Sequence, residues 1–420
     1  MKIFSKASLI FLTVAIVAGL NFFLDGCKYD APSLFDPGTA PQPIVDSLSP
    51  AGGALAGIDT IRVYGKNFSA NPADDGVYFN ATLVNNTGII QASTTMLTLK
   101  APAISGDTIF VRVFVIGAVD FSPTVRYSMK AAIDSLTVFA SGEGGYGLSL
   151  GSDGNLYASL SNANLSVKDE GIFRINADGT IQTPAYILPT TSPVNQQWPA
   201  FKFGPSNAAY AVKGSRAVYK LVPGQSNPGA TPWAVFPSGA INDLDFDPGH
   251  NLWMGGSGLK TGADTTNIVM ATLTPTTQTY HFPGSVRSVR YFDGYLYFAA
   301  TVEGVSQVWR ASVSGTTLGT PEVYFDASTA YSGAVPTIYA IAFSADGDMY
   351  VGLDAPDYLI IVHANGVVDK PYSLYVSSGV LYSPCKAFAW VGTTLYATTS
   401  TGTLLRVATG KQSAPYYGIQ

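Results

Sequence analysis

Six residues at matching places in a repeated sequence pattern are candidates for a ligand-binding site. Each occupies, or in one case adjoins, the position two residues before the first apolar anchor of a short strand: Tyr146, Trp198, Asn242, Arg287, Tyr339 and Lys386. Aromatic rings stack on sugar rings, and cations hold acidic groups. The six positions therefore predict a rim that binds a ligand, and the alternative is an ordinary solvated rim.

The same set contains no carboxylate, which argues against a calcium site. Calcium is held by several oxygen ligands, and Glu143, Asp243 and Asp245 lie close in sequence but not at these positions. The three histidines of the chain lack a Cys, Glu or second His at metal-ligand spacing, and they form no recognisable triad pattern. We therefore expect no catalytic residue, no metal site and no cofactor.

The six positions belong to six repeats, each of which contains an aromatic residue after a tight turn. These aromatic residues are 53, 43, 44, 53 and 46 residues apart, and they are Tyr157, Tyr210, Trp253, Tyr297, Tyr350 and Tyr396. An alternating strand pattern precedes each turn and a third strand follows, whereas no helical period competes. Repeats of this length are typical of β-propellers.

The outermost strand of each repeat decides whether the ring closes. Five such strands follow the first five repeats, at 186–188, 233–236, 279–282, 323–325 and 373–376. The sixth is found upstream, at 135–139, where it would complete the last blade and remove a free sheet edge. The pattern therefore predicts a six-bladed β-propeller over 133–411, with a C-terminal tail at 412–420.

Two of the turns carry a family resemblance. Asp153-Gly154-Asn155-Leu156-Tyr157 and Asp346-Gly347-Asp348-Met349-Tyr350 resemble the repeats of NHL-type and related six-bladed propellers, over about two thirds of the chain. This resemblance implies a fold rather than an activity, because propellers host many unrelated functions. Six-bladed relatives include calcium-dependent lactonases and lyases, so a lactonase or lyase is one alternative function.

A smaller all-β domain is expected over 44–129, where short alternating strands are separated by Gly, Pro and Asn turns. About 85 residues of this pattern suit an immunoglobulin-like β-sandwich. The segments 44–50 and 61–68, together with Gly52-Gly53, resemble an IPT/TIG domain, and 77–79 and 94–97 continue the resemblance. Such domains usually act as spacers.

The sequence of the N-terminus predicts a targeting segment. Lys2 and Lys6 precede an apolar run, as in a secretory signal peptide over 1–26. The sequence Leu24-Asp25-Gly26-Cys27 resembles a bacterial lipobox, which implies cleavage before Cys27 and lipidation of that residue. Lys28 then favours the outer membrane, and the proline-rich stretch 27–43 is expected to be an extended tether.

Composition narrows the choice of partners. The net charge is −5, charged residues make up 12% of the chain, and no cluster of Lys and Arg appears, so nucleic acid is not an expected partner. Lipidation of Cys27 would leave Cys385 as a lone thiol, which we expect to be a buried spacer.

Together these features predict an all-β protein, an IPT/TIG-like sandwich followed by a six-bladed propeller, at the bacterial cell surface. The favoured function is non-catalytic binding of an extracellular glycan or protein at the propeller mouth, with the membrane reached through the lipid on Cys27. A structural or adhesive envelope protein without a small ligand is the second alternative, and an envelope protein partner is compatible with either.

Overall fold

The computed structural model describes residues 40–420 apart from ten internal gaps. These gaps are 140–142, 163–170, 183–185, 187–197, 214–215, 224–231, 237, 262–263, 332–334 and 378. The predicted signal peptide, Cys27 and the tether up to residue 39 therefore lie outside the described residues. In the described part, no helix has the length and apolarity needed to cross a membrane.

The N-terminal strands form two sheets. One sheet has the order β1 (Ile44–Ser49), β3 (Thr60–Lys66), β7 (Met96–Lys100), β6 (Ile89–Ser93). The other has the order β2 (Ala54–Leu55), β9 (Val125–Lys130), β8 (Gly106–Val115), β4 (Asp75–Phe79), β5 (Thr82–Val84). Burial alternates along β3 and β8, so each strand turns one face to a core and one to solvent.

Gly65 shows why this sandwich needs a residue without a side chain on β3. A Cβ atom at this position would lie 1.9 Å from the carbonyl oxygen of Ile44 and 2.4 Å from the Phe68 ring. The Phe68 ring is buried. Glycine therefore allows Phe68 to fill the end of the core, as the sequence pattern predicts for these two residues.

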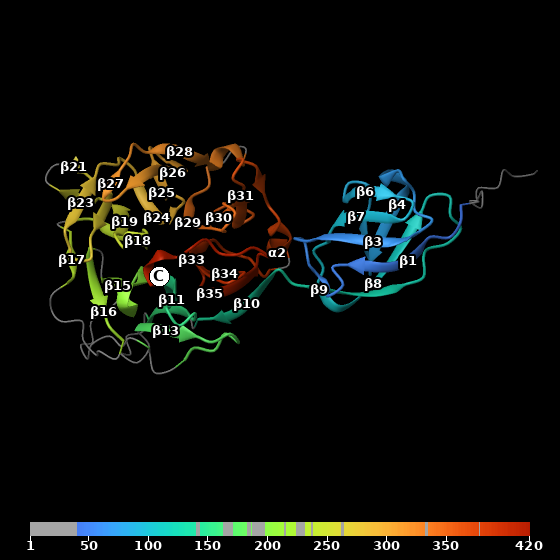
Figure 1. Ribbon diagram of the computed structural model, residues 1–420, viewed down its shortest axis with the longest axis horizontal. Coiled ribbons are helices and arrows are strands. Elements are labelled where there is room, and N and C mark those ends of the chain that lie inside the picture. The colour runs from blue at the N-terminus through green and yellow to red at the C-terminus, as the bar shows by residue number, and fades with distance from the viewer. Residues whose placement is uncertain are drawn as a thin grey trace, which may run out of the picture. The chain divides into compact units, whose positions relative to one another are not determined.

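The larger of two compact units contains all of Arg126–Gln420, and its described residues form six antiparallel sheets of three or more strands. Figure 1 shows these sheets around the C-terminus. Their first strands are β11 (Glu143–Leu150), β14 (Phe201–Gly204), β18 (Ala240–Phe246), β24 (Ser285–Phe292), β29 (Ile338–Phe343) and β33 (Cys385–Val391).

The second and third strands continue each sheet outward. The second strands are β12 (Leu156–Asn162), β15 (Ala208–Lys213), β19 (Leu252–Ser257), β25 (Tyr295–Val302), β30 (Met349–Leu353) and β34 (Thr394–Thr399). The third strands are β13 (Gly171–Ile175), β16 (Ala217–Leu221), β22 (Ile268–Ala271), β26 (Val305–Ser314), β31 (Leu359–Val362) and β35 (Thr403–Ala408). The second and third strands β30, β22 and β31 are buried throughout.

The first strands contact one another in a closed cycle. β11 contacts β14, which contacts β18, and the series continues through β24, β29 and β33 back to β11. The last sheet is completed by the N-terminal strand β10 (Ile133–Val138), which pairs antiparallel with β35 from Ile133–Val407 to Val138–Thr403. The all-β fold class, with an immunoglobulin-like domain and a propeller, is confirmed.

In two of the repeats, the repeated aromatic residue donates a hydrogen bond to an acid of the turn before it. Tyr157 is fully buried, and its hydroxyl donates to Asp153 Oδ2 at 2.8 Å; Trp253 Nε1 donates to Asp247 Oδ2 at the same distance. A buried ring that also satisfies its polar atom combines core packing with a hydrogen bond. In these two repeats the turn acid and the aromatic residue therefore stabilise the same part of the sheet.

The outermost strands differ in part from the prediction. β17 (Ala234–Val235), β23 (Thr277–Tyr280) and β28 (Glu322–Asp326) overlap the expected segments, whereas 187–188 lie outside the described residues. The strand expected at 373–376 is wrong: this segment is the short helix α2 (Ser373–Ser377), and β32 (Val368–Asp369) is the outer strand. Pro371 lacks an N–H for a sheet ladder and is compatible with a helix start.

Cys385 gives a test of the core at the start of β33. Its thiol is fully buried, and burial raises its pKa to about 12. We expect iodoacetamide at pH 8 to leave Cys385 unmodified in the folded protein and to alkylate it in urea, because only the thiolate reacts. Peptide mass spectrometry measures this, and rapid alkylation of Cys385 in the folded protein would contradict the packing.

Candidate functional site

Two cavities lie along the axis that the first strands surround. Pro199, Asn242, Arg287 and Lys386 line a small cavity, which we call the entry mouth, near the start of these strands. A larger cavity of about 480 Å³ lies where the strands end, and we call it the tail cavity because the residues after 412 help to line it. Lys202 and Arg290 line both cavities, so they stand between them.

Three of the predicted ligand residues form one cluster beside the entry mouth: Arg287 and Lys386 line it, and Tyr339 contacts both of them. Arg287 on β24 places its guanidinium carbon 5.5 Å from the centre of the Tyr339 ring on β29. Lys386 on β33 places Nζ 3.0 Å from the same centre. All three side chains are partly exposed. Three sheets therefore contribute one cluster in which two cations share an aromatic ring.

The electrostatics of this cluster are those of a site that favours negative charge. The pKa of Lys386 is lowered to about 8 by its partial burial and by the positive charge of Arg287, while Asp354 acts weakly in the opposite direction. The Nε atom of Arg287 is buried and has no described hydrogen-bond partner. Both cations are thus partly desolvated without a described counter-ion.

The other three predicted residues lie in different environments. Asn242 lines the entry mouth, where its Nδ2 donates to the Val286 carbonyl at 2.7 Å. Trp198 is only 2% exposed and packs in the core against Tyr219, which corrects its assignment as a rim residue. Tyr146 lies on β11, but its side chain is outside the described residues, so its role stays a prediction.

A buried ionic network that the sequence analysis did not identify as a unit separates the two cavities. Arg290 Nη1 lies 2.6 Å from Asp243 Oδ2, which also accepts from Ser288 Oγ at 2.8 Å. Asp245 Oδ2 accepts from the Tyr291 N–H at 2.9 Å, and burial raises its pKa. Asp243 and Asp245, two of the acids that lie close in sequence to the predicted mouth, are therefore bonded to a neighbouring cation and to backbone and side-chain donors.

Lys202 is the second cation of this network. Its Nζ donates to the Leu148 carbonyl at 3.1 Å, and the side chain is buried. Burial, followed by the charge of Arg290, lowers its pKa to about 8. The network contains two cations and two carboxylates, so its formal charges balance in the middle of the propeller.

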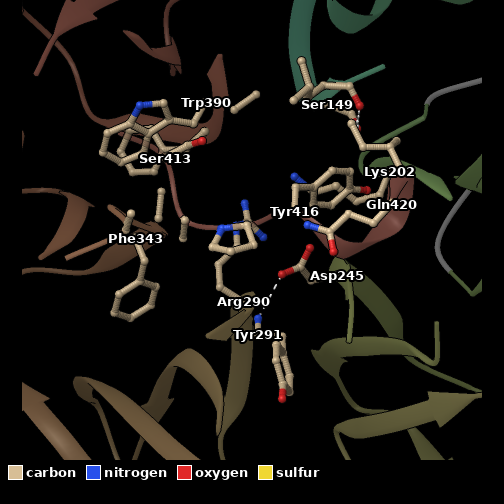
Figure 2. Close-up of a pocket in the computed structure, with 18 residues that line it drawn as sticks. Ser149, Lys202, Asp245, Arg290, Tyr291, Phe343, Trp390, Ser413, Tyr416 and Gln420 are labelled. Carbon is tan, nitrogen blue, oxygen red and sulfur yellow. Dashed lines mark hydrogen bonds between the residues drawn. The ribbon is translucent and has the colours of Figure 1, made fainter. Parts of the chain in front are cut away.

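The C-terminal tail enters the tail cavity, as Figure 2 shows. Ala414 N–H donates to the Phe343 carbonyl at 3.1 Å, and the partly buried Tyr416 donates to the Phe203 carbonyl. A Cβ at Gly418 would lie 2.2 Å from that carbonyl. In the same view Arg290 stands between Phe343 on one side and Tyr416 on the other. The segment predicted only as a tail is therefore part of the propeller structure.

The histidines do not gather at either cavity. His363 Nδ1 lies 2.9 Å from Asp348 Oδ1, and Lys411 also contacts this carboxylate. Among the residues that the structure describes, no group of three or more His, Cys, Asp and Glu side chains is arranged to hold a metal ion.

The comparisons with known proteins identify the N-terminal domain by sequence and the rest of the chain only by fold. Residues 43–128 match the family model of the IPT/TIG domain, about a fifth of the chain. No curated protein sequence matches the chain. The luciferin-regenerating enzyme shares 11% identity at a TM-score of 0.50, with 69% of this chain and 99% of that chain covered.

Two further solved structures cover more of the chain. A structural genomics protein of unknown function from Bacteroides thetaiotaomicron VPI-5482 shares 15% identity at a TM-score of 0.47. An auxiliary nutrient binding protein from Bacteroides ovatus ATCC 8483 shares 10% identity, also at 0.47. Each alignment covers 87% of this chain and 98% of the other. At identities this low, such similarities concern the fold alone.

The ionic network gives a stability prediction. Asp243→Asn leaves Arg290 buried without its carboxylate, and we expect the free energy of unfolding to fall by about 3–5 kcal/mol. The matched control is Asp134→Asn, which breaks the exposed pair with Arg406 (Nε to Oδ1, 3.1 Å) and is expected to cost about 1 kcal/mol or less. Urea unfolding followed by tryptophan fluorescence measures both, and equal losses would contradict the network.

Proposed function

We propose that this protein is a non-catalytic cell-surface lipoprotein whose propeller binds an extracellular ligand, a glycan or a protein, at the entry mouth. The observation that supports this function is the convergence of Arg287, Tyr339 and Lys386 from three separate sheets. Their partly exposed cationic and aromatic groups are suited to recognition, since they combine charge, hydrogen-bond donors and a flat apolar surface.

The entry mouth is a better candidate than the larger tail cavity because of how the charges are paired. Arg290, which lines both cavities, is neutralised by Asp243, and in the tail cavity Tyr416 and other residues of the tail already line the space. At the entry mouth, the described structure holds no ion pair to Arg287 or Lys386 and no tail residue lines the cavity. A ligand at the mouth can therefore supply interactions that the chain leaves unmade.

The remaining parts of the proposal concern the organisation of the chain. We place the six-bladed propeller at 133–411, with 135–139 in the last blade, and the IPT/TIG-like domain at 44–129 as a spacer. The signal peptide, 1–26, is removed, Cys27 is lipidated, and 27–43 tethers the protein to the outer membrane. This arrangement is supported by the basic and apolar N-terminus and by the sequence 24–27.

The proposed mouth is tested by a pair of substitutions. Tyr146→Ala combined with Tyr339→Ala removes two aromatic residues, and we expect the affinity for the best hit of a glycan array to fall at least about tenfold, since aromatic packing and the support for both cations are lost. Isothermal titration calorimetry measures the loss on the full chain. The matched control is Tyr64→Ala, an exposed tyrosine of the sandwich.

Unchanged binding in the double variant would rule out this mouth. Hydrolysis of members of a lactone panel by this protein, if it ceases when EDTA is added, would instead support the lactonase or lyase alternative. Absence of any ligand on glycan and protein arrays would favour the structural or adhesive alternative.

A further inference from the structure

At the entry mouth, the positive charges of Arg287 and Lys386 have no carboxylate in ion-pair distance in the described structure, because Asp243, which also lines this cavity, is paired with Arg290. Arg287 and Lys386 both rest on Tyr339, at 5.5 and 3.0 Å from its centre. Like charges repel most strongly where water is partly excluded. Neither cation forms an ion pair within the described part of the chain. The folded protein therefore keeps two like charges close together, and a bound anion would reduce their repulsion.

The rest of the propeller shows that this arrangement is specific to the mouth. Arg290, three residues further along β24, is neutralised by Asp243 at 2.6 Å. Lys202 lies in the same network as two carboxylates and donates to a carbonyl at 3.1 Å. By contrast, Arg287 Nε is buried without a described partner. A buried donor without an acceptor is unfavourable, so a ligand acceptor would stabilise it.

We infer that the entry mouth binds a carboxylate group, held between Arg287 and Lys386, and that the ligand is a glycan containing uronic acid residues. This inference rests on the proposed function, since it names the ligand class of the same mouth. A carboxylate matches a guanidinium and an ammonium better than a neutral hydroxyl does, because both hydrogen bonds are then charge-assisted. The small volume beside these side chains suits such a compact group.

The neutral groups around the cations favour a sugar over an acidic peptide. Asn242 uses Nδ2 to bind the Val286 carbonyl, which leaves its Oδ1 without a described partner beside Arg287. Tyr339 adds a hydroxyl of its own. A sugar acid carries hydroxyl donors next to its carboxylate, so one residue of a uronate chain can satisfy the amide oxygen and both cations.

The binding experiment uses the full chain in detergent and three probes at low ionic strength. These are an oligogalacturonate, the same oligosaccharide with its carboxylates reduced, and an oligoglutamate peptide. We expect calorimetry to detect the oligogalacturonate, with at least about tenfold weaker binding of the reduced form and of the peptide. Lys386→Met and Arg287→Gln are each expected to weaken oligogalacturonate binding by a similar factor.

A matched charge control separates a local site from general attraction. Lys220→Met removes one exposed cation from the third strand β16 and is expected to leave the affinity unchanged. Thermal unfolding of each variant shows whether the fold is kept. Where Lys386→Met loses stability, the pH dependence of the unmodified chain provides an independent measurement of the same interaction.

The pH dependence has a definite sign. The groups that act on Lys386 are Arg287, Tyr339 and Asp354, and the network of Lys202, Asp243 and Arg290 lines the same cavity. With a Lys386 pKa of about 8, the ammonium is present at pH 7 and mostly lost at pH 9. Affinity for the oligogalacturonate should therefore fall about tenfold between these values, because the free protein must first take up a proton. Lys386→Met should abolish this change.

The outcomes distinguish this inference from the function on which it rests. Equal binding of the reduced and acidic oligosaccharides, lost in Tyr339→Ala, would overturn the carboxylate inference and leave the mouth intact. Preference for oligoglutamate would overturn the choice of a glycan. Binding that survives all three substitutions at the mouth would contradict the mouth itself, and absence of binding to all three probes would overturn the inference.

Discussion

Closure of the propeller by its N-terminal strand is the constraint on which the rest of the structure depends. β10 pairs with β35 from Ile133 to Val138, so the last sheet joins the beginning of the propeller to its end. This pairing covers a strand edge that would otherwise be free. The first strands then contact each other in a closed cycle. Residues separated by about a hundred positions, such as Arg287 and Lys386, are brought onto one ring by this closure.

The charged side chains that the strands carry toward the axis are either ion-paired within the protein or available to a ligand. The middle of the propeller shows the first solution, where Arg290 and Lys202 are balanced by Asp243 and Asp245. The entry mouth shows the second, because its two cations are placed on an aromatic ring with no described carboxylate in ion-pair distance. The same fold therefore provides a stable centre and an electrostatically incomplete mouth.

The sequence was sufficient to predict the fold class, because the period-two patterns and turn residues act locally. It also placed Asn242, Arg287 and Lys386 at one cavity, since residues at equivalent offsets share a height in the ring. It could not place Trp198, whose burial depends on packing within its own blade. The packing of the C-terminal tail into the propeller was missed for a similar reason. Tyr416 and Ala414 form hydrogen bonds with strands that are distant in sequence, and such contacts leave no local sequence pattern. Clustered aromatic residues at the C-terminus were the available signal.

A crystal structure of the full chain with a bound oligogalacturonate tests the central claim most directly. The account predicts electron density at the entry mouth, with a ligand carboxylate within hydrogen-bond distance of Arg287 and Lys386 and a hydroxyl on Asn242. Density in the tail cavity beside Trp390, with the entry mouth containing only solvent, would contradict it.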